Sequence, residues 1–408
     1  MAADTETSRR AFFRFLAASP LVASLDLPHY FTAALGQDSD LVKAAKDALD
    51  VFDFEAVARK TLLPAHLGYL ETGTDDDGTV RANREGFDRY QLRVRRLIDT
   101  SKVDQSARML GVRWDTPVLL CPCGSHKAFH PDGEVAVARA SKSKKQLFVL
   151  ATPATASIEE VTAARGEPVW FQLYQRNDWN QTRQMIKRAE ASGSPVLVYT
   201  IDMLGGSNRL TNARATRGDK TDCTSCHPGG RGARNSRQPM TADLKPAPPA
   251  PEVGPPTWEY VKRLKDATPM KLVLKGIVTR DDAEIALQHG VDGVWVSNHG
   301  GRAENSKRST VECVPEIARG VAGRAPIIVD SGFRRGTDIF KALALGATMT
   351  GIGRPYLWGL ASFGQEGVEM VLDILRRELQ MVMRQAGTTD LTKITGAYVI
   401  DRFAVPRT

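Results

Sequence analysis

The sequence predicts an α/β fold, a single (β/α)8 barrel of the TIM type with an N-terminal helical extension. Short β-rich runs alternate with helical patterns, which indicates parallel strands joined by crossover helices. The runs are almost continuously apolar, as in a sheet that is covered on both faces. Eight such units occupy about 240 residues, which fits closure into a barrel better than the alternative, an open doubly wound sheet.

The expected strands are rich in β-branched and aromatic residues and end in polar or glycine-containing segments. They are Val118–Pro122, Phe148–Thr152, Trp170–Tyr174, Val196–Asp202, Leu272–Gly276, Gly293–Asn298, Ile327–Gly332 and Met349–Arg354. Apolar residues at helical spacing predict helices at Glu134–Ser143, Thr182–Ser192, Asp281–His289 and Thr337–Leu345, and before the first strand at 40–62. This last helix is the expected extension.

The composition restricts the class of protein. With 408 residues, 42% hydrophobic and 25% charged, the chain fits a globular protein that forms one barrel with insertions. The net charge of +8 suits an acidic ligand. The basic residues are dispersed, however, without an aromatic-interleaved stripe, which argues against nucleic-acid binding. Five cysteines are too few for a disulfide scaffold.

Residues 1–28 resemble a twin-arginine export signal. Arg9 and Arg10 are followed by Phe12 and Phe13 and then by a weakly apolar run. This signal would export a folded protein to the periplasm. The alternative is an amphipathic helix with two chance arginines. No stretch reaches the roughly 18 apolar residues that a membrane span needs. We expect residues 29–408 to form the barrel.

One connection in the barrel is unusually long. Between Asp202 and Leu272 the sequence lacks strong periodicity, and it contains a Gly/Arg-rich run at 229–237 and a proline-rich run at 245–256. Connections of this kind are lids, binding loops or disordered segments. We therefore expect a flexible loop at about 213–256.

Cys223, Cys226 and His227 lie in this loop with the Cys-x-x-Cys-His spacing of a covalent haem attachment site. The loop leaves no room for a cytochrome domain and offers little apolar housing for a haem. Three interpretations stay open: covalent haem, a disulfide or metal clip within the loop, and no special role.

Polar and ionisable residues end the expected strands, and the active site of such a barrel lies at these carboxyl ends. Solvation of strand ends explains some of them. It poorly explains Lys275, His299 and Asp330, each of which ends an apolar strand. The whole set is Thr152, Gln172, Tyr174, Thr200, Asp202, Lys275, Ser297, His299, Asp330 and Arg354.

The last two strands predict a phosphate site. The seventh is followed by the glycine- and arginine-containing run 330–337, and the eighth by Gly353-Arg354-Pro355. In phosphate-binding barrels these two loops supply backbone N–H groups and a helix N-terminus. Arg354 can add a charge-assisted contact. Turn chemistry alone is the simpler alternative, but it does not account for two such loops with arginines.

The runs 297–302, 330–336 and 353–355 resemble the signatures of the FMN-dependent 2-hydroxy-acid dehydrogenase family, which includes glycolate oxidase, lactate oxidase and mandelate dehydrogenase. The resemblance extends from about Phe54 to Gly387. It implies FMN as cofactor and the oxidation of a small 2-hydroxy acid to the 2-keto acid. It also implies a homotetramer and an electron acceptor, which would be oxygen, a cytochrome or a quinone.

The resemblance implies a role for each candidate residue. His299 would be the general base, because imidazole titrates near working pH, and Asp202 would orient it. Arg302 and Arg209 would hold the substrate carboxylate through a planar fork; for Arg209 the alternative is an ordinary surface arginine.

Further implied roles concern the substrate oxygens and the flavin. Tyr174 and Tyr69 would donate hydrogen bonds to substrate oxygens, and Lys275 would lie beside flavin N1 to stabilise developing negative charge. The remaining implied roles are cofactor binding, by Thr152, Gln172, Thr200, Lys275, Ser297, Asp330, Ser331, Gly332, Arg334, Gly353 and Arg354.

The sequence also departs from the family pattern. Proline is absent between Asp202 and Arg209, Gln-Leu-Asp after Arg302 is replaced by residues 303–305, and Ser331 stands where glycine is usual. Cys123-Gly124 replaces the commoner Thr-Ala. These changes leave the substrate open. An alternative from another class is a flavin- or haem-binding electron-transfer protein without 2-hydroxy-acid turnover.

Overall fold

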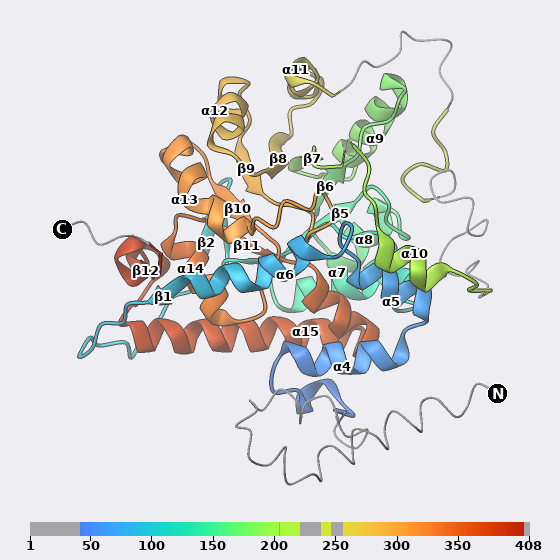
Figure 1. Cartoon of the computed structure of the whole chain (residues 1–408). Coiled ribbons are helices and arrows are strands. Elements are labelled where there is room, and N and C mark those ends of the chain that lie inside the picture. Colours follow the sequence, from blue (N-terminus) through green and yellow to red (C-terminus); the bar gives the residue numbers. More distant parts are fainter. Residues whose placement is uncertain (1–40, 204, 221–237, 246–255, 404–408) are drawn as a thin grey trace. The chain divides into compact units, whose positions relative to one another are not determined.

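Eight parallel strands close into a barrel in the computed structural model, which describes residues 41–203, 205–220, 238–245 and 256–403 (Figure 1). The strand order around the barrel is β10-β11-β4-β5-β6-β7-β8-β9. The strands are β4 (Val118–Leu120), β5 (Leu147–Ala151), β6 (Trp170–Leu173), β7 (Val196–Thr200), β8 (Lys271–Ile277), β9 (Gly293–Val296), β10 (Ile327–Val329) and β11 (Met349–Ile352). The predicted (β/α)8 barrel is confirmed.

The strand boundaries differ slightly from the prediction. Seven strands end one to three residues earlier than expected, and β8 ends one residue later. The polar residues that were assigned to strand ends therefore lie mostly in the loops that follow the strands. This is the expected direction of error, because a polar side chain that turns into a site no longer continues the ladder of backbone hydrogen bonds.

Helices connect the strands and cover the barrel. They are α7 (Gly133–Ser143), α8 (Ile158–Arg165), α9 (Trp179–Ala191), α10 (Leu210–Thr216), α11 (Trp258–Ala267), α12 (Arg280–Gln288), α13 (Thr310–Val321), α14 (Gly336–Ala344) and α15 (Arg354–Ala386). The four helices that were predicted between strands are confirmed within three residues at each end. Helix α15 is kinked, because Phe363 and Gly364 have non-helical backbone angles.

The predicted helical extension is present but is not one helix. The stretch 40–62 contains a short 3-10 helix, η1 (Ala45–Asp47), and then α4 (Val51–Thr61). Asp50 lies between them in an extended conformation and caps α4, since its carboxylate accepts a hydrogen bond from the Phe52 N–H. Side chains of this type favour a helix start over a helix interior, which explains the break.

Two further helices and two small sheets surround the site. Helices α5 (Pro64–Glu71) and α6 (Gly78–Glu85) precede the barrel. Strand β1 (Tyr90–Leu92) pairs with β12 (Val399–Asp401), and β2 (Ala107–Met109) pairs with β3 (Val112–Trp114), in both cases antiparallel.

The described part of the long connection after β7 contains regular structure. Helices α10 and α11 lie within the stretch that was predicted to lack it, and Met240 is buried in the main hydrophobic core. The haem-type sequence Cys223, Cys226 and His227 lies outside the described residues, as does most of the predicted flexible loop, so both stay predictions.

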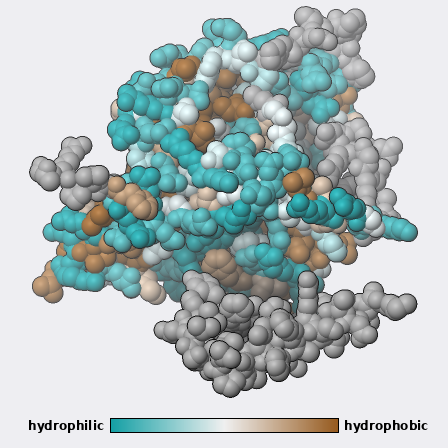
Figure 2. Space-filling model, viewed as in Figure 1, coloured by the Kyte–Doolittle hydropathy of each residue, from teal (hydrophilic) through white to brown (hydrophobic). Residues whose placement is uncertain are grey.

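The barrel interior holds a separate hydrophobic cluster that includes Leu119, Cys121, Trp170 and Trp295. The face of the molecule in Figure 2 is mostly hydrophilic, with hydrophobic residues in small separate groups. Among the described residues, no helix has both the length and the apolar character that crossing a membrane requires.

Candidate active site

A cavity lies at the carboxyl ends of the barrel strands. This is the end at which barrel enzymes carry their active sites. Most of the predicted site residues line it, namely Tyr69, Tyr174, Lys275, His299, Arg302, Asp330, Ser331, Gly332, Arg334, Gly353 and Arg354. The others, Asp202, Arg209, Thr152, Gln172, Thr200 and Ser297, are not among its lining residues.

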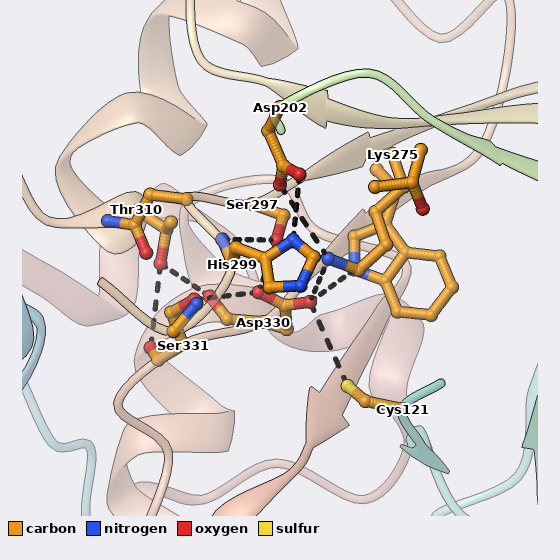
Figure 3. A network of polar contacts seen from close by, with 12 residues as sticks. Cys121, Asp202, Lys275, Ser297, His299, Thr310, Asp330 and Ser331 are labelled. Carbon is orange, nitrogen blue, oxygen red and sulfur yellow. Dashed lines mark hydrogen bonds and ion pairs between the residues drawn. The ribbon is translucent and has the colours of Figure 1, made fainter. Parts of the chain in front are cut away.

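His299 and Asp202 form a hydrogen-bonded pair at this cavity (Figure 3). The His299 Nδ1 atom lies 2.7 Å from Asp202 Oδ1, and its Nε2 atom lies 3.2 Å from the Tyr174 hydroxyl. A carboxylate at Nδ1 holds the hydrogen of the neutral ring on that nitrogen. The lone pair is then on Nε2, which can accept a proton.

The backbone and the charges around His299 support this role. His299 has a φ of +59°, a conformation that is uncommon outside glycine and is found at active sites. Burial lowers the pKa of His299 below its usual value, although Asp202 acts in the opposite direction. Burial also opposes ionisation of Asp202, but His299 and Lys275 together hold the pKa of that carboxyl below its usual range. The ring is therefore neutral, and the carboxylate charged, near neutral pH.

Lys275 is buried between two carboxylates. Its Nζ atom lies 3.3 Å from Asp330 Oδ2 and 3.9 Å from Asp202 Oδ2, and it donates a hydrogen bond to Ser297 Oγ at 2.7 Å. Burial opposes its charge, but Asp330 and Asp202 raise the pKa of Lys275 to about 12. Gly276 follows with a φ of +116° at an irregularity of the β8–β9 pairing, and a Cβ atom there would lie 2.8 Å from the Cβ of Asp202. Glycine therefore allows the lysine and Asp202 to approach.

Arg302 is anchored beneath the cavity by helix α5. Its guanidinium donates to the carbonyl oxygens of Tyr69, Leu70 and Thr72 through Nε and Nη2, and it lies over the Tyr69 ring at 5.0 Å. Nη1 makes no hydrogen bond within the described part of the chain. The sequence predicted a two-pronged fork for a substrate carboxylate, whereas the geometry leaves a single nitrogen for it.

Arg334 and Arg354 line the same cavity, where the sequence predicts a phosphate site, and this role stays a prediction. Both are largely buried, and neither forms a salt bridge with any described residue. Burial, together with repulsion from Arg302 and Arg334, lowers the pKa of Arg354 to about 9, and burial lowers the pKa of Arg334 to about 10. Buried cations without a carboxylate partner are costly. A phosphate would neutralise them.

The backbone of the β10 loop fits the same group. Gly332 has a φ of +87°, and a Cβ atom there would lie 2.0 Å from the carbonyl oxygen of Asn83. Only glycine therefore fits at this point of the cavity wall. Together with the arginines, this loop fits the phosphate end of FMN.

Thr152, Gln172 and Thr200 form a hydrogen-bonded row across β5, β6 and β7. Thr152 donates to the Gln172 carbonyl oxygen at 2.7 Å and Gln172 Nε2 donates to Thr200 Oγ1 at 3.0 Å. All three are buried. Their contact with a flavin edge stays a prediction.

Arg209 lies just before α10, with Nη2 at 4.0 Å from Met203 Sδ. The loop that carries it is tied to the segment after α5: Thr211 donates to Asp77 at 2.5 Å and Asn208 donates to Asp75 at 2.9 Å. Arg209 is not among the residues that line the cavity, and its role in binding carboxylate stays a prediction.

Three residues were missed by sequence reasoning. Cys121 and Cys123 line the cavity, and Trp295 donates an indole hydrogen bond to Asp330 Oδ2 at 3.0 Å. Cys123 stood out only as a departure from the family pattern. Trp295 lies inside an apolar strand, where an aromatic residue reads as ordinary core, so its sequence gave no signal.

The fold and this site define a flavin-dependent barrel enzyme, and comparison with known proteins agrees. Residues 58–401 match the model of the FMN-dependent dehydrogenase family. Glycolate oxidase 1 of Oryza sativa subsp. indica is 35% identical over 88% of this chain and 98% of its own. 2-Hydroxyacid oxidase 2 of Rattus norvegicus is 37% identical over 84% of this chain and 96% of its own.

Solved structures give the same result. A mutant of an active chimera of (S)-mandelate dehydrogenase superposes with a TM-score of 0.78 at 31% identity, covering 87% of this chain and 99% of that one. A variant of mandelate oxidase superposes with a TM-score of 0.77 at 31% identity, covering 88% of this chain and 99% of that one. The chain belongs to the FMN-dependent 2-hydroxy-acid oxidase and dehydrogenase family.

Proposed function

We propose that this enzyme oxidises a small 2-hydroxy acid to the 2-keto acid with His299 as general base. The observation that carries the proposal is the Asp202–His299 pair, whose Nε2 atom faces a cavity that also exposes Arg302 and Lys275. Bound FMN would supply the two-electron acceptor for the substrate carbon.

Other residues would bind the substrate and assist the proton transfer. Arg302 would bind the substrate carboxylate through Nη1, which its contacts with α5 leave available, and Tyr69 and Tyr174 would donate hydrogen bonds to substrate oxygens. His299 Nε2 would then take the proton of the 2-hydroxyl group. Asp202, 2.7 Å from Nδ1, would stabilise the imidazolium that forms.

Lys275, Arg334 and Arg354 would serve the cofactor. The two arginines would bind its phosphate, and the Lys275 ammonium would lie near the part of the ring where negative charge develops. The oxidases among the relatives favour oxygen as the final electron acceptor. A cytochrome or a quinone is the alternative.

The test is an anaerobic screen of 2-hydroxy acids against the purified flavoprotein, read by loss of the visible flavin absorption. We expect one or more of them to bleach it. His299→Gln should bind FMN normally and lose about 10²- to 10⁴-fold in the rate of bleaching, since the proton has no acceptor. His289→Gln is the matched control, because this histidine stacks on Trp258 outside the cavity.

Two results would contradict the proposal. If no 2-hydroxy acid bleaches the flavin, the protein is a flavin-binding electron carrier. If His299→Gln bleaches within threefold of the unchanged protein, His299 is not the base.

We further propose that the chain is exported by the twin-arginine route, on the sequence of residues 1–28. This route transports folded proteins, so FMN would be bound before export.

A further inference from the structure

Trp295 contacts two charged residues that line the cavity, Lys275 and Asp330. It is fully buried in β9, and its backbone pairs with Lys275 of β8, so the two side chains point to the same side of the sheet. The Lys275 Nζ atom lies 5.7 Å from the centre of the indole ring. The indole Nε1–H donates to Asp330 Oδ2 at 3.0 Å. One side chain thus contacts both members of the Lys275–Asp330 ion pair.

The acceptor positions of the Asp330 carboxylate are occupied by hydrogen bonds from other residues of the protein (Figure 3). Its Oδ1 atom accepts hydrogen bonds from Ser297 at 2.8 Å and Ser331 at 2.7 Å. Its Oδ2 atom accepts from Trp295, and from the Cys121 thiol at 3.8 Å. A carboxylate has about four acceptor positions. Asp330 therefore has none left for a hydroxyl group of the cofactor, although the resemblance implies that it binds the cofactor.

The hydrogen-bond donors to Asp330 change the electrostatic potential around Lys275. The ammonium is paired with Asp330 at 3.3 Å, and an uncompensated carboxylate at that distance would cancel much of its charge in a buried site. Each N–H, O–H or S–H that points at Asp330 places a partial positive charge on it. The potential on the cavity side of the pair is then more positive than it would be without these donors.

We propose that Trp295 is a positioning residue that holds Asp330 in place and offsets its charge, so that Lys275 raises the reduction potential of bound FMN. The proposal rests on the proposed function, in which FMN lies beside Lys275. Cys121 contributes in the same direction through a weaker donor.

The test measures the two-electron midpoint potential of bound FMN in purified variants. Trp295→Phe removes the indole N–H and keeps an aromatic ring. We expect the ratio of reduced to oxidised FMN affinity to fall about tenfold, which for a two-electron couple lowers the potential by about 30 mV. Trp170→Phe is the matched control, since Trp170 belongs to the same interior cluster and has no side-chain hydrogen bond or ring contact among the described residues. Its potential should be unchanged.

Trp295→Phe leaves a space in the barrel interior and can fail to fold. Two more variants therefore test independently the direction in which the midpoint potential of FMN changes. Cys121→Ser replaces a weak donor to Asp330 by a strong one and should raise the potential. Asp330→Asn removes the negative charge beside Lys275 and should raise it further.

The outcomes separate the two proposals. If the unchanged protein binds no FMN, the proposed function fails. If FMN is bound but Trp295→Phe matches the Trp170→Phe control, or if Cys121→Ser and Asp330→Asn leave the potential unchanged or lower it, the inference is overturned while the proposed function stands.

Discussion

His299 and Lys275 share the carboxylate of Asp202, and this sharing links the proposed base to the lysine that is proposed to lie beside the flavin. Asp202 Oδ1 contacts His299, and Oδ2 lies 3.9 Å from Lys275. The Oδ2 atom has no hydrogen-bond partner in the described structure. Proton transfer to His299 would therefore occur beside a carboxylate whose charge is already partly balanced by the lysine.

Asp202 should control the pH dependence of the reaction. Burial lowers the pKa of His299, and the negative charge of Asp202 partly restores it. The base is active when neutral, so kcat/KM should stay constant from neutral pH down past about 6.5, the ordinary histidine pKa. Removing the carboxylate in Asp202→Asn disfavours the imidazolium further. The acid limb of the profile should then move to lower pH while kcat falls about 10²-fold or more.

The measurement is kcat and kcat/KM across pH in the unchanged enzyme and in Asp202→Asn. A purely structural role for Asp202 would lower activity without moving the acid limb. A limb that moves to higher pH would show that Asp202 does not favour the charged form of His299.

Two helices connect the substrate and cofactor ends of the site. The carbonyl oxygens at the end of α5 accept from Arg302, and those of Leu70, Glu71 and Thr72 also accept from Arg354. Helix α10 is fixed to the segment after α5 by Thr211 and Asn208. The end of α5 is thus the common support of both arginines and of the loop that carries Arg209.

Sequence reasoning located these elements but not their mutual contacts. The eight strands were predictable because parallel strands in a covered barrel are apolar runs, and the site residues were predictable because they follow those runs. The contacts of Arg302 with α5 and of Trp295 with Asp330 join distant segments. They depend on side-chain directions that no local pattern encodes, so the sequence predicts a free fork for Arg302 and no role for Trp295.

The hydrogen bonds between the start of α10 and the segment after α5 should affect substrate binding. Thr211→Val removes the hydrogen bond to Asp77 and loosens the loop that begins α10. A hydrogen bond of this kind contributes about 1 kcal/mol, so we expect KM to rise about fivefold with FMN affinity unchanged. Steady-state kinetics and FMN titration would test this.

Thr216→Val is the matched control for that substitution. Among the described residues, its hydroxyl bonds only to carbonyl oxygens of its own helix, at Asn212 and Ala213, so KM should not change. Equal effects in the two variants would show that the tie to α5 has no role.

The stability of the whole barrel should depend on binding of the FMN phosphate. Burial lowers the pKa values of Arg334 and Arg354. Near neutral pH both side chains are charged, and in the absence of FMN their buried charges lower the free energy of unfolding. The sign follows from their lowered pKa values: this penalty is present below pH 9 and is relieved only above it. An anion that neutralises them should stabilise the fold at pH 7.

FMN should therefore raise the melting temperature of the protein freed of cofactor, and inorganic phosphate should raise it by less. A ligand at 100 times its Kd contributes about 2.7 kcal/mol. Arg354→Ala should remove most of the increase. Arg113→Ala, at an exposed ion pair with Asp104, is the control and should keep it. An increase that survives in Arg354→Ala would place the phosphate elsewhere.

Export is the last property of the whole chain that the sequence predicts, whereas a homotetramer rests on the resemblance alone. Residues 1–28 carry Arg9 and Arg10 before two phenylalanines and a weakly apolar run, and this pattern is typical of a signal for folded cargo. Changing the pair to Lys-Lys should leave FMN-loaded, active enzyme inside the cell and none in the periplasm. Arg14→Lys, a substitution of the same kind outside the pair, should be exported normally. Fractionation of cells followed by flavin fluorescence measures both. Equal periplasmic amounts of the two variants would mean that Arg9 and Arg10 are chance residues of an amphipathic helix.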